Sequence, residues 1–276
     1  PSSAASDVYK RQYEFLIEIW KWVSIRKSKP VEFIFDYSQT PFFIHHQQKQ
    51  KSSMKKAVIL GVGPEAGLGA QLALRFAREG MHVLAASRTP SALEKLVAKI
   101  RESGGEATAV PTDATNEEQV VSLFENAGAD LEVAVYNAGN NHPGRIVEMD
   151  TEYFENSWRV CCLGGFLFGR EAVKRMLPKK NGTLLFTGAS ASLRGRANFG
   201  AFNSAKSGLR TLAQAMSKEY GPEGIHVAHV IIDGAINGKK IKEELDRALV
   251  LHRNGQLDNC LLYTSPSPRD QRGSGM

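Results

Sequence analysis

The sequence predicts an α/β fold in which helices cover both faces of a parallel sheet. Short apolar runs alternate with amphipathic helical stretches through residues 54–259. The first apolar run leads into a glycine-rich turn and then a helical segment, within Lys55–Glu79. No internal repeat or linker interrupts the alternation, and six strands are expected. This pattern is typical of a single domain of about 200 residues with the doubly wound Rossmann arrangement.

The expected elements follow from the apolar runs and from the residues that stop them. Strands are expected at Ala57–Leu60, His82–Ala86, Ala107–Val110, Leu131–Val135, Thr183–Thr187 and His226–Ile232. Helices are expected after the glycine turn and at Pro90–Ser103 (capped by Thr89), Asn116–Ala127, Thr151–Met176 and Phe199–Tyr220.

Composition and charge exclude several classes of protein. The chain has 276 residues and a net charge of +6, but residues 54–259 hold 25 basic against 23 acidic side chains. A charge balance this even does not indicate a surface that binds nucleic acid. The three cysteines give neither a disulfide framework nor metal-ligand spacing, so we expect a reducing, cytoplasmic setting and no metal site. No apolar run is long enough to span a membrane.

The two ends differ in composition from the middle. Pro1–Gln12 and Cys260–Met276 resemble translated adapter or vector sequence, and residues 13–53 lack the alternating pattern. We expect residues 1–53 to be a non-native or disordered extension, although 13–53 could be a genuine one. Met54 is then the natural start, residues 54–259 form the domain, and residues 260–276 are an adapter-like tail.

The glycine turn predicts a dinucleotide site. Gly63 and Gly67 permit a tight turn and the close approach of a pyrophosphate. The helix that begins near Leu68 offers free N–H groups to that anion, and Gly69 lets the helix pack closely on the sheet. The alternative is an ordinary strand, turn and helix without a ligand.

The residues after the second strand bear on the choice of cofactor. An acidic residue there would bind the ribose hydroxyls of NAD and repel a 2′-phosphate. This chain has Ser87, Arg88 and Thr89 and no carboxylate. Arg88 can pair with a phosphate, which favours NADP(H) over NAD, and the alternative is a solvated surface arginine.

Residues 54–259 resemble the short-chain dehydrogenase/reductase family. Gly63–Gly69 resembles the family's TGxxxGxG turn, with Val62 in place of the threonine. Four further motifs occur in the family's order: Asp113 for the aspartate against adenine, Asn137-Ala138-Gly139 for the NAG motif that supports the central sheet, Phe202–Lys206 for YxxxK, and Asp233-Gly234 for Pro-Gly.

The resemblance implies an NAD(P)(H)-dependent oxidoreductase that acts on a small-molecule carbonyl or alcohol, as a homo-oligomer (dimer or tetramer). It assigns the cofactor to Gly63, Gly67, Leu68, Gly69, Ser87, Arg88, Asp113, Asn137, Ala138, Gly139, Lys206 and Gly234. A family member would also have a lid helix, here Lys239–Leu251, and then a seventh strand, which this sequence is expected to lack.

The catalytic positions depart from the family's pattern. In the family a tyrosine donates the proton, a lysine four residues later lowers its pKa, a serine holds the substrate oxygen and an asparagine holds a water. Here Lys206 is kept, Phe202 occupies the tyrosine slot and Cys161 the asparagine slot. The serine slot falls on Ala189, with Ser190 one residue on.

Each catalytic candidate has a plainer interpretation. Lys206 could serve only to bind ribose, Ser190 could only stabilise a turn, and Cys161 could be only a small buried side chain. Three functions therefore stay open: an oxidoreductase with an impaired or altered site, a non-catalytic NADP(H)-binding module (sensor or partner subunit), and an interaction scaffold built on the long helices. The glycines, Asp113 and Lys206 favour the first two.

Overall fold

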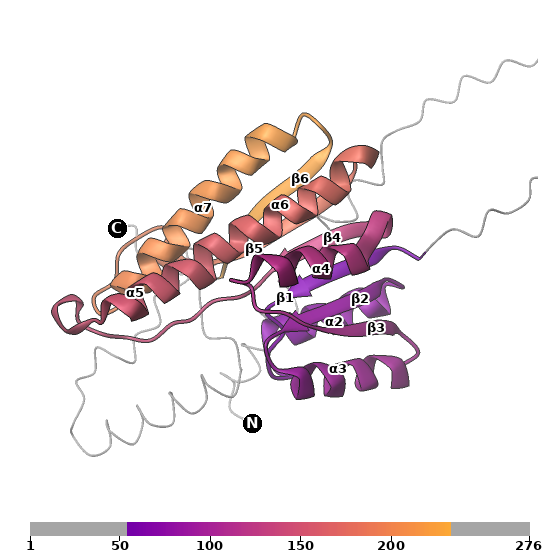
Figure 1. The fold of residues 1–276 in the computed structure, drawn as a ribbon, viewed down its shortest axis with the longest axis horizontal. Helices are drawn as coiled ribbons and strands as arrows, with labels where there is room; N and C mark the ends of the chain where they lie inside the picture. The colour runs from indigo at the N-terminus through magenta and orange to yellow at the C-terminus, as the bar shows by residue number, and fades with distance from the viewer. Residues whose placement is uncertain (1–53, 233–276) are drawn as a thin grey trace, which may run out of the picture.

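A six-stranded parallel sheet forms the centre of the protein in the computed structural model, which describes residues 54–232 (Figure 1). The strand order is β3-β2-β1-β4-β5-β6. This confirms the predicted α/β doubly wound class, in which ligands bind at the carboxyl edge where the strand order reverses, here between β1 and β4. The strands are β1 (Lys56–Leu60), β2 (His82–Ser87), β3 (Glu106–Pro111), β4 (Leu131–Tyr136), β5 (Gly182–Ala189) and β6 (Ile225–Ile232).

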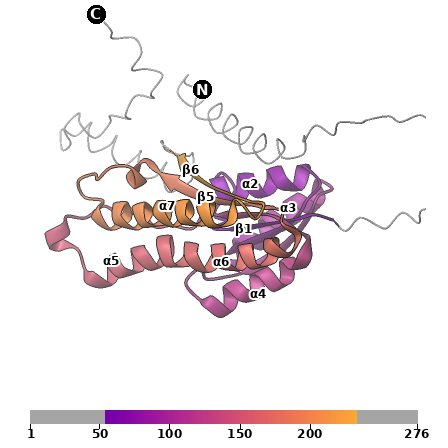
Figure 2. The same ribbon diagram turned by 90° about the horizontal axis from the view of Figure 1, so that it is seen from above.

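Helices cover both faces of this sheet (Figure 2). One face carries α2 (Leu68–Arg78) and α3 (Pro90–Glu102), and the other carries α4 (Glu117–Ala127), α6 (Gly164–Met176) and α7 (Gly200–Tyr220). Because side chains alternate along a strand, each strand contributes to two cores. In β1, Ala57 and Ile59 pack with α2 and α3, whereas Val58 and Leu60 pack toward α4 and α6.

The predicted elements are present, with ends that differ by one or two residues. Thr89 does occupy the cap position of α3, but its side chain makes no capping hydrogen bond. Asn116 was expected inside a helix and instead caps α4, where its side chain accepts a hydrogen bond from Gln119 N at 3.0 Å. An asparagine side chain competes with backbone hydrogen bonding inside a helix and therefore favours the cap.

The prediction of one regular helix over Thr151–Met176 was wrong in its middle. The stretch contains α5 (Thr151–Trp158), a π-helical turn η3 (Arg159–Leu163) and then α6. The buried Tyr136 hydroxyl donates a hydrogen bond to Val160 O, inside this turn. A side chain that engages a helix carbonyl disturbs the regular hydrogen-bond ladder, which explains the wider turn.

Several expectations lie outside the described residues. These are the two chain ends, Asp233, Gly234, the lid helix Lys239–Leu251 and the seventh strand. Within residues 54–232, no helix has the length and apolar character needed to cross a membrane.

Candidate cofactor and active site

The carboxyl ends of β1 and β4 are tied together at the point where the strand order reverses. Asn137 N donates to Leu60 O at 2.7 Å, and Asn137 Nδ2 donates to Gly61 O at 2.9 Å. Gly61 has φ +104°, and a Cβ there would lie 2.4 Å from the Asn137 carbonyl carbon. Asn137 therefore supports the central sheet, as expected from the NAG motif, and Gly61 is a structural requirement that the sequence analysis did not single out.

The glycine turn combines close packing with open space. A Cβ at Gly69 would lie 2.4 Å from Gly61 O, so α2 can sit against the turn only without a side chain there. A Cβ at Gly63 would meet nothing within 4 Å, which leaves its backbone open to a ligand. Gly67 N closes the turn on Pro64 O at 2.7 Å. Leu68 begins α2 and is buried.

The amino end of α2 is suited to an anion. Its cap residue, Gly67, supplies no side-chain hydrogen bond, and the first turn contains no acidic residue. The first backbone N–H groups of a helix lack intrahelical acceptors and carry a partial positive charge. A dinucleotide pyrophosphate fits this combination of an open glycine backbone and free N–H groups.

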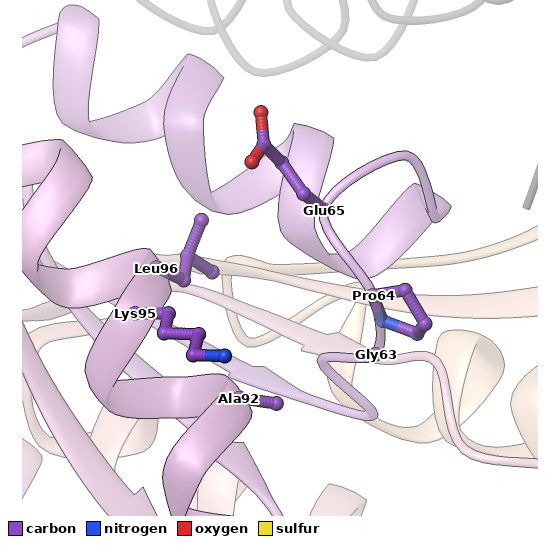
Figure 3. A pocket seen from close by; sticks show the side chains of 6 residues that line it. All are labelled: Gly63, Pro64, Glu65, Ala92, Lys95 and Leu96. Carbon is purple, nitrogen blue, oxygen red and sulfur yellow. The ribbon is translucent and has the colours of Figure 1, made fainter. Parts of the chain in front are cut away.

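A pocket lies between the glycine turn and α3 (Figure 3). It is lined by Gly63, Pro64, Glu65, Ala92, Lys95 and Leu96. Lys95 extends from α3 toward the turn (Figure 3). Glu65 also belongs to the turn, and its carboxylate pairs with Lys99 one helical turn further along α3. Glu65 is therefore compensated by a cation, and Lys95 remains positioned beside the glycine turn.

The other predicted adenosine contacts lie at the same edge of the sheet. Arg88 is exposed in the turn between β2 and α3 and does not line the pocket in Figure 3. Ser87 Oγ accepts a long hydrogen bond from Thr89 N at 3.5 Å. Asp113 Oδ1 accepts from both Thr115 N and Thr115 Oγ1 at 2.8 Å, so it organises the turn after β3. Their contacts with a cofactor remain predictions.

Lys206 is the buried charge of the site. It lies on α7 with 5% of its surface exposed, and Nζ donates to Thr187 O at 2.9 Å. Burial lowers the pKa of the Lys206 ammonium, and the nearby Cys161 sulfur raises it to a smaller extent. No ion pair includes Lys206 within residues 54–232. A buried ammonium without a carboxylate is costly, and such a group is a candidate for a functional role.

Gly139 and Cys161 surround the Lys206 ammonium. A Cβ at Gly139 would lie 3.5 Å from Lys206 Nζ and 3.6 Å from Cys161 Sγ. Cys161 comes from the π-helical turn and is completely buried. The sequence placed Cys161 in the family's asparagine slot, and the structure puts its sulfur beside the ammonium. Ala138 is partly buried against the core below.

Phe202 stands one helical turn before Lys206, as the YxxxK spacing predicts. Lys206 Nζ lies 5.8 Å from the centre of the Phe202 ring, within range of a cation–π contact. The ring has no hydroxyl, so it cannot donate a proton. The structure thus brings together Lys206, Phe202, Gly139 and Cys161.

Ser190 belongs to a turn rather than to the end of β5. It begins the short 3₁₀ turn η5 (Ser190–Ser192), and its carbonyl accepts from Leu193 N at 2.9 Å. Ala189, the position expected for a serine, is the last residue of β5. Ser192 Oγ closes the turn by donating to Ala189 O at 2.7 Å. These bonds support the plainer interpretation of Ser190, and its catalytic assignment remains a prediction.

Three polar side chains near the site were given no role by the sequence analysis, although Asn203 was expected to flank the site. Tyr136 shapes the π-helical turn, and burial raises its pKa well above the ordinary range. Asn203 is 8% exposed and donates to Arg194 O at 3.3 Å, which ties α7 to the loop after β5. His229 on β6 is half-buried, and its Nε2 is enclosed. No local signal marks these residues, because their neighbours come from distant segments.

The chain matches a known enzyme family over most of its length. The family model described as "short chain dehydrogenase" matches residues 55–246. The "Uncharacterized oxidoreductase YxjF" of Bacillus subtilis (strain 168) is 32% identical over 211 residues, which are 75% of this chain and 81% of that protein. A "3beta-hydroxysteroid dehydrogenase" of Mediterraneibacter gnavus is 30% identical over 179 residues, which are 61% of this chain and 62% of that protein.

A solved structure agrees with this match. The crystal structure of a short-chain dehydrogenase from Rhodopseudomonas palustris superposes with a TM-score of 0.63 and 39% sequence identity. The alignment covers 70% of this chain and 90% of that chain.

Proposed function

Because the chain belongs to the short-chain dehydrogenase family of NAD(P)-dependent oxidoreductases, we propose that it interconverts a carbonyl and an alcohol with NADP(H). The observation that carries the proposal is the buried Lys206 ammonium beside Gly139, at the same sheet edge as the open glycine turn. The nicotinamide, when bound, supplies or accepts the hydride. The names of the relatives, an oxidoreductase and a hydroxysteroid dehydrogenase, support this reaction class.

Different residues bind the two halves of the cofactor and stabilise the reacting oxygen. The glycine turn and the amino end of α2 bind the pyrophosphate, and Arg88 and Lys95 supply positive charge for a 2′-phosphate. Lys206 binds the ribose of the nicotinamide half and provides a positive field where negative charge develops on the substrate oxygen. Phe202 contributes no proton, so solvent delivers it and the reaction is slow.

The test begins with cofactor binding and then measures turnover. NADPH and NADH are titrated into the full chain, and NADPH consumption is followed with a panel of ketones and aldehydes. Lys206→Met should abolish turnover and weaken NADPH binding. Lys218→Met, an exposed lysine on the same helix, is the control and should change neither. NADPH binding without turnover on any substrate would instead support a non-catalytic cofactor-binding module, and no binding of either cofactor would refute both.

We further propose that the protein works as a homo-oligomer through α5 and α6. Phe154, Trp158 and Phe166 are 44%, 44% and 41% exposed on these consecutive helices. Large exposed aromatic side chains are enriched at interfaces between proteins. Light scattering after size-exclusion chromatography should show an oligomer that Trp158→Glu dissociates, with Leu193→Glu as an exposed apolar control outside α5 and α6. A monomer in the unmutated protein would refute this.

A further inference from the structure

His229 reaches the Lys206 centre from the neighbouring strand. In the β5–β6 ladder it lies opposite Phe186, and the adjacent β6 position on the same face, Val227, packs in the core beneath α7. The imidazole extends over Gly188: a Cβ at Gly188 would lie 2.0 Å from His229 Cε1 and 2.3 Å from His229 Nε2. The ring can occupy this position only because residue 188 has no side chain.

The Lys206 side chain extends from α7 to the peptide group that precedes Gly188. Its Nζ donates to the carbonyl of Thr187, the residue directly before Gly188. The two side chains therefore meet the Thr187–Gly188 peptide, one from β6 and one from α7. Among residues 54–232, the charged or titratable groups that act on this place are Lys206 and Arg210 from α7 and Cys161 from η3, and β5 contributes none.

The hydrogen-bonding capacities of the two groups are complementary. His229 Nε2 is enclosed and has no hydrogen-bond partner among the described residues. Nδ1, by contrast, is not among the buried nitrogens without a partner. A neutral ring with its proton on Nδ1 presents a lone pair at Nε2. Lys206 has three N–H groups, and the hydrogen bond to Thr187 O uses one of them.

We propose that His229 is a positioning residue for Lys206. In this structure the ammonium donates to Thr187 O and Nε2 of His229 accepts no hydrogen bond, and a turn of the ammonium toward the neutral imidazole forms a second hydrogen bond there. A bond of this kind favours the charged form of the lysine and fixes its direction. It offsets part of the cost of burying an ammonium that has no carboxylate partner in the part of the chain that the structure describes. The consequence for catalysis rests on the proposed function, but the contact itself does not.

The charge state of His229 agrees with an acceptor role. Burial and then the charges of Lys206 and Arg210 lower the pKa of His229 to about 4. The ring is therefore neutral above that pH and can accept. Below that pH the ring becomes an imidazolium, which repels the Lys206 ammonium and has no acceptor lone pair. The hydrogen bond therefore requires the neutral form of His229.

The first test uses the unmutated full chain at neutral pH. Long-range ¹⁵N–¹H spectra of histidine-labelled protein identify the tautomer of each imidazole. We expect His229 Nε2 to be unprotonated and hydrogen-bonded, and a proton on Nε2 would overturn the proposal. The His229 resonance is assigned by its absence in His229→Gln.

The second test measures the pKa of Lys206 directly, from the ¹³Cε resonance that Lys206→Arg removes. His229→Leu should lower this pKa by about one unit, a roughly tenfold change in the dissociation constant. His229→Gln retains an acceptor and should restore most of it. His226→Gln, from the same strand, is the control. An unchanged Lys206 pKa in folded His229→Leu would refute the proposal.

The same titration separates this proposal from the proposed function. If no substrate turns over but His229→Leu still shifts the Lys206 pKa, the positioning role stands and the enzymatic proposal fails. If the enzyme is active, the alkaline limb of its pH–rate profile should move to lower pH in His229→Leu. If the apparent pKa of the alkaline limb is unchanged in a folded, active His229→Leu variant, the proposed role of His229 is also refuted.

Discussion

The glycine turn and the Lys206 centre lie at the same edge of the sheet but are built in opposite ways. The glycine turn depends on missing side chains: a Cβ at Gly69 would lie 2.4 Å from Gly61 O, and one at Gly63 would project into open space. The Lys206 centre (Lys206, Cys161, Gly139 and Phe202) depends instead on buried side chains, with Cys161 and the Lys206 ammonium packed around Gly139. The first region presents backbone to a ligand, and the second holds a charge in place by enclosing it.

This difference shows why one region matches its family and the other has changed. The glycine turn tolerates few alternatives, because Gly61 and Gly69 are required by close approaches of other backbone atoms and Gly63 leaves its backbone open to a ligand. A buried side-chain centre keeps its packing when one residue is exchanged for another of similar volume. The exchange expected at Phe202, a phenylalanine at the family's tyrosine position, preserves the ring and removes only the hydroxyl. The fold therefore survives a change that removes a proton donor.

The largest expected effect restores that donor. Phe202→Tyr adds a hydroxyl to a ring already 5.8 Å from Lys206 Nζ, measured to its centre. The ammonium should lower the pKa of the new phenol, and a positioned general acid contributes about 10²- to 10⁴-fold in rate. NADPH consumption with ketones and aldehydes should rise accordingly, and most when Ala189→Ser is combined with it.

The pH dependence sharpens this prediction. Without a protein donor, the rate of the unmutated protein should rise as the pH falls, because solvent supplies the proton. The tyrosine variant should depend on pH more weakly on the acidic side. Equal rates for both proteins would show that residue 202 is not the limiting position and that another group donates the proton.

The next effect concerns the adenosine half of the cofactor. Arg88→Asp should reverse the cofactor preference from NADPH to NADH, since loss of a charge-assisted contact costs on the order of 1.5–3 kcal/mol in binding. Binding isotherms for both cofactors measure it. Lys95→Ala tests the pocket beside the turn separately, and should weaken only NADPH. Equal affinity of the unmutated protein for the two cofactors would remove the case for Arg88.

A pair of glycine substitutions separates folding from binding within the turn. Gly69→Ala should lower the free energy of unfolding by about 1–3 kcal/mol, because its methyl group overlaps the Gly61 carbonyl. Gly63→Ala meets no protein atom, so stability should hold while NADPH binding weakens. Chemical denaturation and cofactor titration measure the two effects. A stable Gly69→Ala with normal binding would contradict the close approach of α2.

The smallest effect tests the side-chain architecture behind the Lys206 centre. Tyr136→Phe removes the hydroxyl that engages Val160 O and leaves that carbonyl without its side-chain donor. The free energy of unfolding should fall by roughly 1 to 2 kcal/mol. Tyr220→Phe, near the end of α7, should have little effect. If both variants are equally stable, Tyr136 does not hold the π-helical turn.

Much of this architecture could be predicted from the sequence because its causes are local. The period of apolar residues gave the strands and helices, and the glycine spacing gave the turn. The four-residue spacing from Phe202 to Lys206 placed these side chains one helical turn apart, as the structure confirms. In each case the physical reason, a helical period or the missing Cβ of glycine, lies within a few consecutive residues.

The sequence alone could not show what distant segments do to one another. That Tyr136 opens a π-helical turn at Val160 depends on β4 packing against the α5–α6 region. That His229 and Lys206 both reach the Thr187–Gly188 segment of β5 depends on β6 pairing with β5 and on the space above Gly188. Such contacts are set by strand register and by which face of the sheet each side chain takes, and register is decided only when the whole core packs.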